Sequence, residues 1–212
     1  MIPCLGVRGG EKAMVKTIRM IWRKMSGLHG ESQPENTEDL KNLYFRYATD
    51  YYVAARFAFF ARSIPTAGNL FHHAVELYLK GSLTHELNEK GRKNLGHRLE
   101  RIWRRFKQSI REPGLDRFDG VIAALDNFES IRYPEKTARL GAGLGFSLAA
   151  PSPILLGSFK DKTPQYTIIV NQIDELVAEL VQKSSVNPHF LKVRISEEEK
   201  IYLTRDNPTT IW

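Results

Sequence analysis

Apolar side chains recur at helical spacing from Glu38 for about a hundred residues, and this regularity limits the fold more than any other feature of the chain. The first stripe is rich in aromatic residues and ends before Pro65, because the residue preceding a proline disfavours the helical conformation. Its members are Leu40, Leu43, Tyr44, Tyr47, Ala48, Tyr51, Tyr52, Ala55 and Phe59. We interpret these rings as core residues and not as a platform for stacked bases.

Three further stripes predict three further helices. The second helix begins at a Thr66 cap and runs to about Leu87, the third follows a connection at 88–96 and ends at Pro113, and the fourth spans 115–131. Because short connections between amphipathic helices make neighbours antiparallel, we predict a mainly α fold, an up-and-down bundle of four to five helices. The expected inward positions are Leu70, Phe71, Ala74, Val75, Tyr78 and Leu79; Leu99, Ile102, Trp103, Phe106 and Ile110; and Phe118, Val121, Ile122, Leu125 and Phe128.

The composition changes after Pro134. Residues 137–170 form a Gly/Pro-rich insertion, in which we interpret the Gly141-x-Gly-x-Gly run as a flexible loop and 166–170 as a short strand. Asn171 caps a last helix, with Ile173, Leu176, Val177, Leu180 and Val181 facing inward. Apolar and polar residues alternate at 190–195 and 201–204, and this pattern predicts a short C-terminal β hairpin or extended tail. The expected organisation is therefore an extension and linker at 1–36, a bundle at 37–184 and an appendage at 185–212.

The spacing of apolar and basic residues predicts a short basic amphipathic helix at Glu11–Met25 in the N-terminal extension. Its charges interrupt the apolar run that a secretory signal needs, and no stretch of the chain is apolar enough for a transmembrane segment. A surface-lying helix, a transit peptide, or a true start at Met14 or Met25 remain open alternatives. With a single cysteine, Cys4, the chain forms no internal disulfide, so we expect a cytoplasmic location.

The formal net charge of +7 is concentrated in two segments. Residues 92–117 carry a net +6 and residues 1–25 a net +5, while the rest of the chain sums to −4. A concentrated positive field favours polyanions, and we expect arginines opposite the apolar face of the third helix to contact phosphates; a merely solvated helix face is the alternative. These arginines are Arg98, Arg101, Arg104, Arg105 and Arg111.

The helical region resembles the HEPN family (higher eukaryotes and prokaryotes nucleotide-binding). The resemblance covers roughly 41–136 and rests on the run AGNLFHHAVELYLKGSL at 67–83, on Gly96-His97-Arg98-Leu99 and on Ile131-Arg132-Tyr133-Pro134. It implies an all-α bundle that forms a homodimer. It also implies a role in RNA cleavage, in toxin–antitoxin or defence systems, or as a non-catalytic partner of a nucleotidyltransferase, with RNA or a nucleotide as ligand.

Ribonucleolytic members of that family are similar in carrying an Arg-x4-6-His motif, which Arg92 and His97 match in spacing. A histidine of this kind exchanges a proton near neutral pH and an arginine binds phosphate, so the chemistry needs no metal. The resemblance thus implies a metal-independent endoribonuclease as the alternative to a binding protein, and whether the chain is an enzyme stays open. A structural protein-interaction module with no nucleic-acid role is a third reading.

A second candidate group lies on the second predicted helix. His72, Glu76 and Lys80 are spaced four residues apart, so they line one helix face, and His73 points about 100° away from His72. We interpret this group as a polar binding stripe without metal, and we expect no cofactor.

Overall fold

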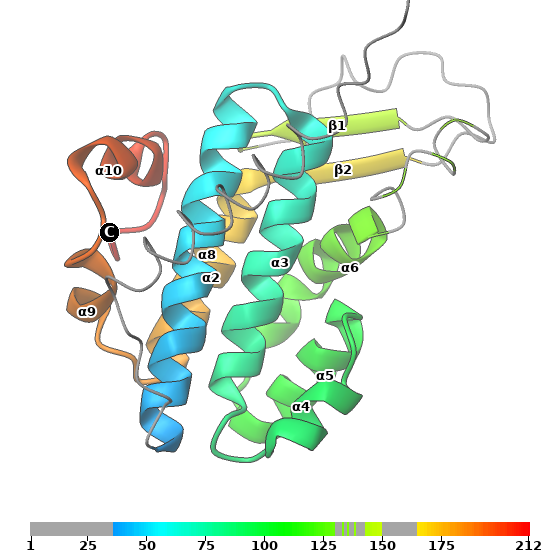
Figure 1. Cartoon of the computed structure of the whole chain (residues 1–212). Helices are drawn as coiled ribbons and strands as arrows, with labels where there is room; N and C mark the ends of the chain where they lie inside the picture. Colours follow the sequence, from blue (N-terminus) through cyan, green and yellow to red (C-terminus); the bar gives the residue numbers. More distant parts are fainter. Residues whose placement is uncertain (1–35, 130–132, 134, 136–137, 139–142, 150–164) are drawn as a thin grey trace, which may run out of the picture. The chain divides into compact units, whose positions relative to one another are not determined.

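The computed structural model describes residues 36–129, 133, 135, 138, 143–149 and 165–212. Its two longest helices are α2 (Thr37–Phe60) and α3 (Ile64–Ser82), which pack against each other as an antiparallel pair. Figure 1 shows them side by side, with α5 and α6 next to α3 and with α9 and α10 next to α2. The structure is mainly helical, which confirms the predicted fold class.

Local signals set the ends of the two long helices. The Asn36 side chain accepts a hydrogen bond from the Asp39 amide at 2.9 Å and so caps α2. α3 begins at Ile64, with Pro65 in its first turn, where a missing amide hydrogen costs nothing. The predicted Thr66 cap is wrong for this reason, and the cap position belongs to Ser63.

Three short α-helices and one 3-10 turn follow α3. The first is α4 (Glu89–Asn94), which lies within the stretch expected to be only a connection. α5 (Leu99–Ile110) matches its prediction, whereas the predicted fourth helix is a 3-10 turn at Leu115–Phe118 followed by α6 (Asp119–Phe128). Residues 131, 132 and 134 of the family-like motif lie outside the described residues.

The core forms where the inward stripes meet. Phe45 and Tyr52 from α2, Phe71 and Tyr78 from α3, and Phe106 from α5 are all fully buried. The predicted inward residues of the last helix are also buried, and this helix, α8 (Val170–Lys183), packs on α3. Its N-cap is Ile169 and not Asn171, which lies in the first turn.

Two short strands pair in parallel, β1 (Gly143–Ser147) and β2 (Gln165–Ile169). β2 confirms the predicted strand near 166–170. β1 corrects the interpretation of the glycine run as a flexible loop: residues 143–147 hydrogen-bond to β2, and Phe146 packs edge-on against Phe128. Gly141 lies outside the described residues.

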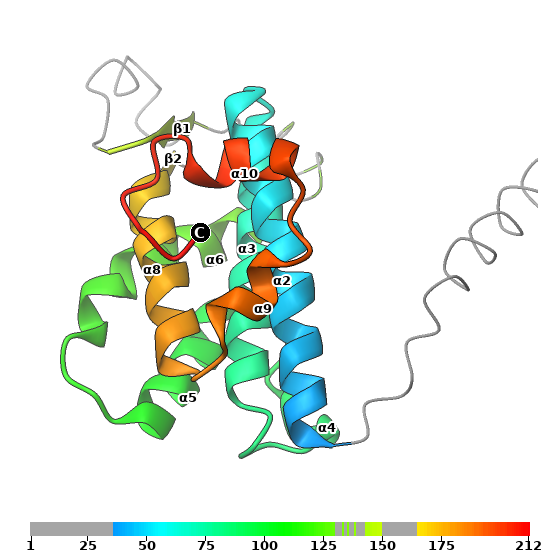
Figure 2. The same cartoon turned by 90° about the vertical axis from the view of Figure 1, so that its left-hand side faces the viewer.

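The predicted C-terminal hairpin is wrong, because both segments are helical: α9 (Pro188–Lys192) and α10 (Glu197–Thr204). Asn187 caps α9, and Ser196 and Glu199 form a reciprocal capping box at the start of α10. The alternation of apolar and polar residues predicted strands wrongly, because Val193 and Ile201 are exposed and do not belong to a buried face. Figure 2 shows α9 and α10 lying along α2, and residues 36–212 form one compact unit that includes the expected appendage.

The predicted N-terminal helix at 11–25 and most of its linker lie outside the described residues. Among the helices that are described, none combines the length and apolar character that crossing a membrane requires.

Candidate functional site

A buried carboxylate on α3, Glu76, is the centre of a polar cluster. His72, Glu76 and Lys80 lie on one face of α3, and all three are buried. Lys80 Nζ donates to Glu76 Oε1 at 2.7 Å. The cluster therefore contains an internal ion pair one helical turn long.

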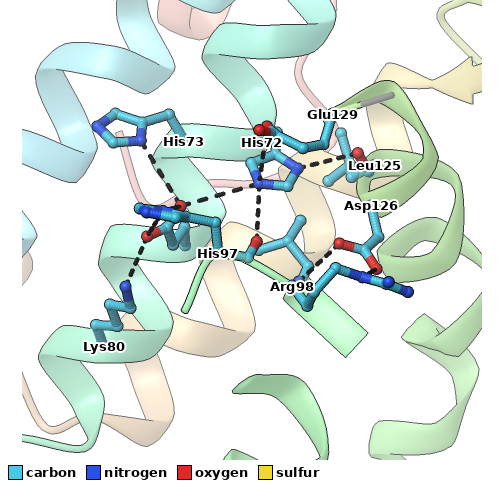
Figure 3. A network of polar contacts seen from close by, with 10 residues as sticks. His72, His73, Lys80, His97, Arg98, Leu125, Asp126 and Glu129 are labelled. Atoms are coloured by element: carbon cyan, nitrogen blue, oxygen red, sulfur yellow. Dashed lines mark hydrogen bonds and ion pairs between the residues drawn. The ribbon is translucent and has the colours of Figure 1, made fainter. Parts of the chain in front are cut away.

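Two further histidines reach the same carboxylate. His97 lies between α4 and α5, directly after Gly96, whose φ of 68° is left-handed and suits glycine. Its Nδ1 lies 3.0 Å from Glu76 Oε1, while the side chain remains 72% exposed. His73 Nδ1 lies 3.8 Å from Glu76 Oε2. Figure 3 shows His73, His97 and Lys80 around this carboxylate.

His72 and His73 point in different directions, as their adjacency requires, yet both approach Glu76 Oε2. The distances are 3.9 Å from His72 Nε2 and 3.8 Å from His73 Nδ1. The glutamate side chain is long enough to place its carboxylate between them.

The environment of Glu76 keeps it ionised. Burial by itself raises the pKa of its carboxyl, but interactions with His73 and Lys80, and the positive charge of Lys80, outweigh burial and lower the pKa to about 2. At neutral pH the cluster therefore holds one fixed negative charge and the compensating charge of Lys80.

A pocket of about 390 Å³ opens beside this cluster. It brings together side chains from four parts of the chain, namely α2, α3, the segment that precedes α5 and the end of α6. Sequence reasoning missed four of its residues: Tyr51, Asn69, Leu70 and Glu129. Asn69 Oδ1 is a buried acceptor that has no hydrogen-bond partner among the described residues. The lining consists of Tyr51, Asn69, Leu70, His72, His73, Glu76, His97 and Glu129.

Arg92 does not join His97 in this pocket. Its guanidinium donates to the Leu87 carbonyl and lies over the Tyr44 ring at 5.8 Å, and the residue is buried. The matching sequence spacing therefore does not bring the two predicted catalytic residues to a common cavity. An arginine in this position stabilises the turn between α3 and α4.

The basic helix α5 has two kinds of cation. Three are paired: Arg98 with Asp126 at 2.8 Å, Arg105 with Glu86 at 2.7 Å, and Lys107 with Asp116 and Asp119. The other three are Arg101, Arg104 and Arg111, which are exposed and pair with no carboxylate in the described part of the chain.

The unpaired arginines lie on α5 and at its C-terminal end. Arg111 is the C-cap residue, and its left-handed φ of 54° takes it out of the helical spacing. At 100° per residue, positions 101 and 104 fall within an arc of roughly 60°. This arc lies opposite Leu99, Ile102, Trp103 and Phe106, which are buried. We name Arg101, Arg104 and Arg111 the arginine stripe. Next to it, Arg104 and Trp103 line a groove of about 300 Å³ between α5 and α6.

No group of three or more metal-ligating side chains is arranged to hold an ion among the residues described. Comparison with known proteins returns no match, whether to a family model, to a curated protein or to a solved structure.

Proposed function

We propose that this chain is a HEPN-like protein that binds single-stranded nucleic acid and acts mainly by binding and assembly in a regulatory or defence system. One observation carries the binding proposal: the arginine stripe is exposed, lies on α5 and at its C-cap, and lacks carboxylate partners among the described residues. Arginine side chains on a rigid helix suit phosphate oxygens, because the guanidinium donates two parallel hydrogen bonds.

Two of the five arginines predicted to contact phosphates are already paired, so the surface expected to bind nucleic acid is smaller than predicted. Arg98 and Arg105 are each already bonded to a carboxylate, so a phosphate that contacts them must compete with Asp126 or Glu86. The stripe alone offers three phosphate contacts. Contacts of this kind position a nucleic acid without reading its bases, so we expect binding that varies little with sequence.

The direct test is titration of a fluorescent single-stranded RNA with the full chain over a series of salt concentrations. Binding that weakens steadily with salt supports the proposal, because each phosphate contact releases a condensed counterion. Absence of binding at low salt contradicts it and leaves the third reading, a structural interaction module.

The assembly part of the proposal is a homodimer, with a nucleotidyltransferase as a further candidate partner. Its support is the outer face of α2, where Tyr47 and Tyr51 stay exposed and Tyr51 packs edge-on against His73 at 4.3 Å. Aromatic side chains are enriched at protein interfaces. Light scattering at micromolar concentration is expected to report about twice 24.3 kDa, and a monomer at all concentrations contradicts this part.

A second candidate function is metal-independent cleavage of RNA. The contact between Glu76 and His97 favours it. The Glu76 carboxylate accepts a hydrogen bond from Nδ1 of His97, and the rest of the His97 ring is exposed, so its Nε2 can exchange a proton with a substrate. A carboxylate that orients an imidazole in this way is a common feature of general acid–base sites. In this version Arg92 takes no part, because it lies outside the pocket.

A further inference from the structure

His72 has a hydrogen-bonding environment that a neutral imidazole cannot satisfy. The residue is only 3% exposed. Its Nδ1 lies 3.1 Å from the Leu125 carbonyl oxygen, and its Nε2 lies 3.2 Å from the His97 carbonyl oxygen. Both neighbours are backbone carbonyls, which accept hydrogen bonds and never donate them.

A neutral imidazole has one N–H donor and one acceptor nitrogen. In that form one of the two contacts would set a nitrogen lone pair against a carbonyl oxygen in a buried site, where unpaired polar groups are costly. The imidazolium form has two donors and satisfies both carbonyls.

Nearby carboxylates favour the same form. Glu76 Oε2 and Glu129 Oε2 lie 3.9 Å and 3.8 Å from His72 Nε2, close enough to stabilise a positive charge in a poorly solvated position. The titratable and charged groups around His72 come from α3, from the segment that precedes α5 and from α6 and its end: His73, Glu76 and Lys80; His97 and Arg98; Asp126 and Glu129.

We propose that His72 donates from both ring nitrogens, to the Leu125 carbonyl and to the His97 carbonyl, and so ties the His97–Arg98 segment to α6. One nitrogen holds the His97 backbone and the other holds Leu125, so His72 is a positioning residue for the pocket wall that carries the His97 ring.

A second set of hydrogen bonds, made by Asp126, holds the same segment. Asp126 accepts from the Leu99 amide at 2.8 Å and from Arg98 Nε at 2.8 Å, which fixes the first turn of α5. Release of His72 is thus expected to loosen the residues just before α5, and not to unfold α5 itself.

The first experiment is long-range proton–nitrogen NMR on full-length protein labelled with ¹⁵N-histidine. Each single His→Gln variant at positions 29, 73, 85, 97 and 189 loses the signal of the replaced histidine, which assigns that signal. The one signal present in all five variants then belongs to His72. At pH 7 both nitrogens of His72 are expected to carry protons that exchange slowly with water. One protonated and one unprotonated nitrogen at pH 7 overturns the proposal. This measurement needs no variant at His72.

The second experiment tests positioning. In His72→Gln a single amide nitrogen cannot reach both carbonyls. The hydrogen-exchange protection of the Gly96 and Leu99 amides, which flank the His97–Arg98 segment and donate to the Lys93 carbonyl and to Asp126, is therefore expected to fall about tenfold, the effect of losing one charge-assisted hydrogen bond. His73→Gln is the matched control, because His73 is 40% exposed and contacts only the Glu76 side chain within the cluster. Its protection should change less than about twofold. Equal protection in wild type and a folded His72→Gln variant overturns the positioning role.

Discussion

Arg56 and Asp174 form an ion pair in which both side chains are completely buried, although 118 residues separate them. The same guanidinium donates to the backbone carbonyls of Tyr202 and Arg205, and Tyr52 donates to Asp174. One side chain on α2 therefore holds both α8 and the segment around α10. This network explains why the C-terminal segment belongs to the bundle.

Removal of Arg56 should be strongly destabilising. Arg56→Met leaves the Asp174 charge buried without its partner, and the free energy of unfolding is expected to fall by about 3–5 kcal/mol. The double variant Arg56→Met with Asp174→Leu removes both charges and should recover much of that loss. Urea unfolding of the three proteins measures both effects. A double variant that is no more stable than Arg56→Met alone contradicts this account of the pair.

Glu76 should make stability depend on pH in acid. Its pKa is about 2 in the folded protein and 4.5 ordinarily, so between these values the unfolded chain binds more protons. The stabilisation, about 3 kcal/mol, is present above pH 4.5 and is lost as the pH falls towards 2. The difference in unfolding free energy between wild type and Glu76→Gln should therefore shrink between pH 6 and pH 3. A difference that stays constant over this range would rule out the stated role of Glu76.

Replacing either of two helical glycines by alanine should change the stability of the protein, in opposite directions for the two positions. A Cβ at Gly68 would lie 2.2 Å from Phe128 Cδ1, inside the core, so Gly68→Ala is expected to cost about 1–3 kcal/mol. Gly120, in the first turn of α6, has nothing within 4 Å of its added Cβ. Gly120→Ala should be stabilising by up to about 1 kcal/mol. Thermal unfolding checks both, and a neutral Gly68→Ala contradicts the close packing of α3 on α6.

If the second candidate function holds, the full chain should cut single-stranded RNA in the presence of EDTA. His97→Ala is expected to lower the cleavage rate by 10² to 10⁴-fold, as removal of a general acid or base does. His85→Ala is the control, since His85 is an exposed histidine whose contact is with Glu38 on α2. Equal cleavage by wild type and His97→Ala points to a contaminating nuclease. Absence of cleavage removes this candidate and leaves the binding proposal intact.

The helices of the bundle were predictable because their inward residues repeat every three or four positions. Leu99, Ile102 and Phe106 are an example, and the structure buries all three. The C-terminal helices were harder to predict, because α9 and α10 are short and bury few side chains, such as Leu191 and Leu203. The capping box at Ser196 and Glu199 was the available signal for α10.

The candidate site was predictable only in part. Helical spacing placed His72, Glu76 and Lys80 together, but it could not place His97, which reaches Glu76 across a loop of the tertiary structure. Spacing along the chain also linked Arg92 to His97, although the Arg92 side chain turns towards Leu87 and Tyr44. Pairing of charges is equally a tertiary property, so the division of the α5 cations into paired and unpaired groups required the structure.

The central claim is that the arginine stripe binds phosphates, and the salt dependence of RNA binding tests it most directly. Three contacts on a single strand imply a slope of log K against log salt of about −2. The variant Arg101→Gln, Arg104→Gln, Arg111→Gln should weaken binding to all sequences alike and flatten the slope by about 2.

The matched control, Arg98→Gln, Arg105→Gln, Lys107→Gln, deletes the same number of charges from cations that are already paired. It is expected to change the slope much less than the stripe variant does. Equal slopes for wild type and the stripe variant, or equal losses in the two triple variants, would contradict the claim that this face of α5 is the nucleic-acid interface.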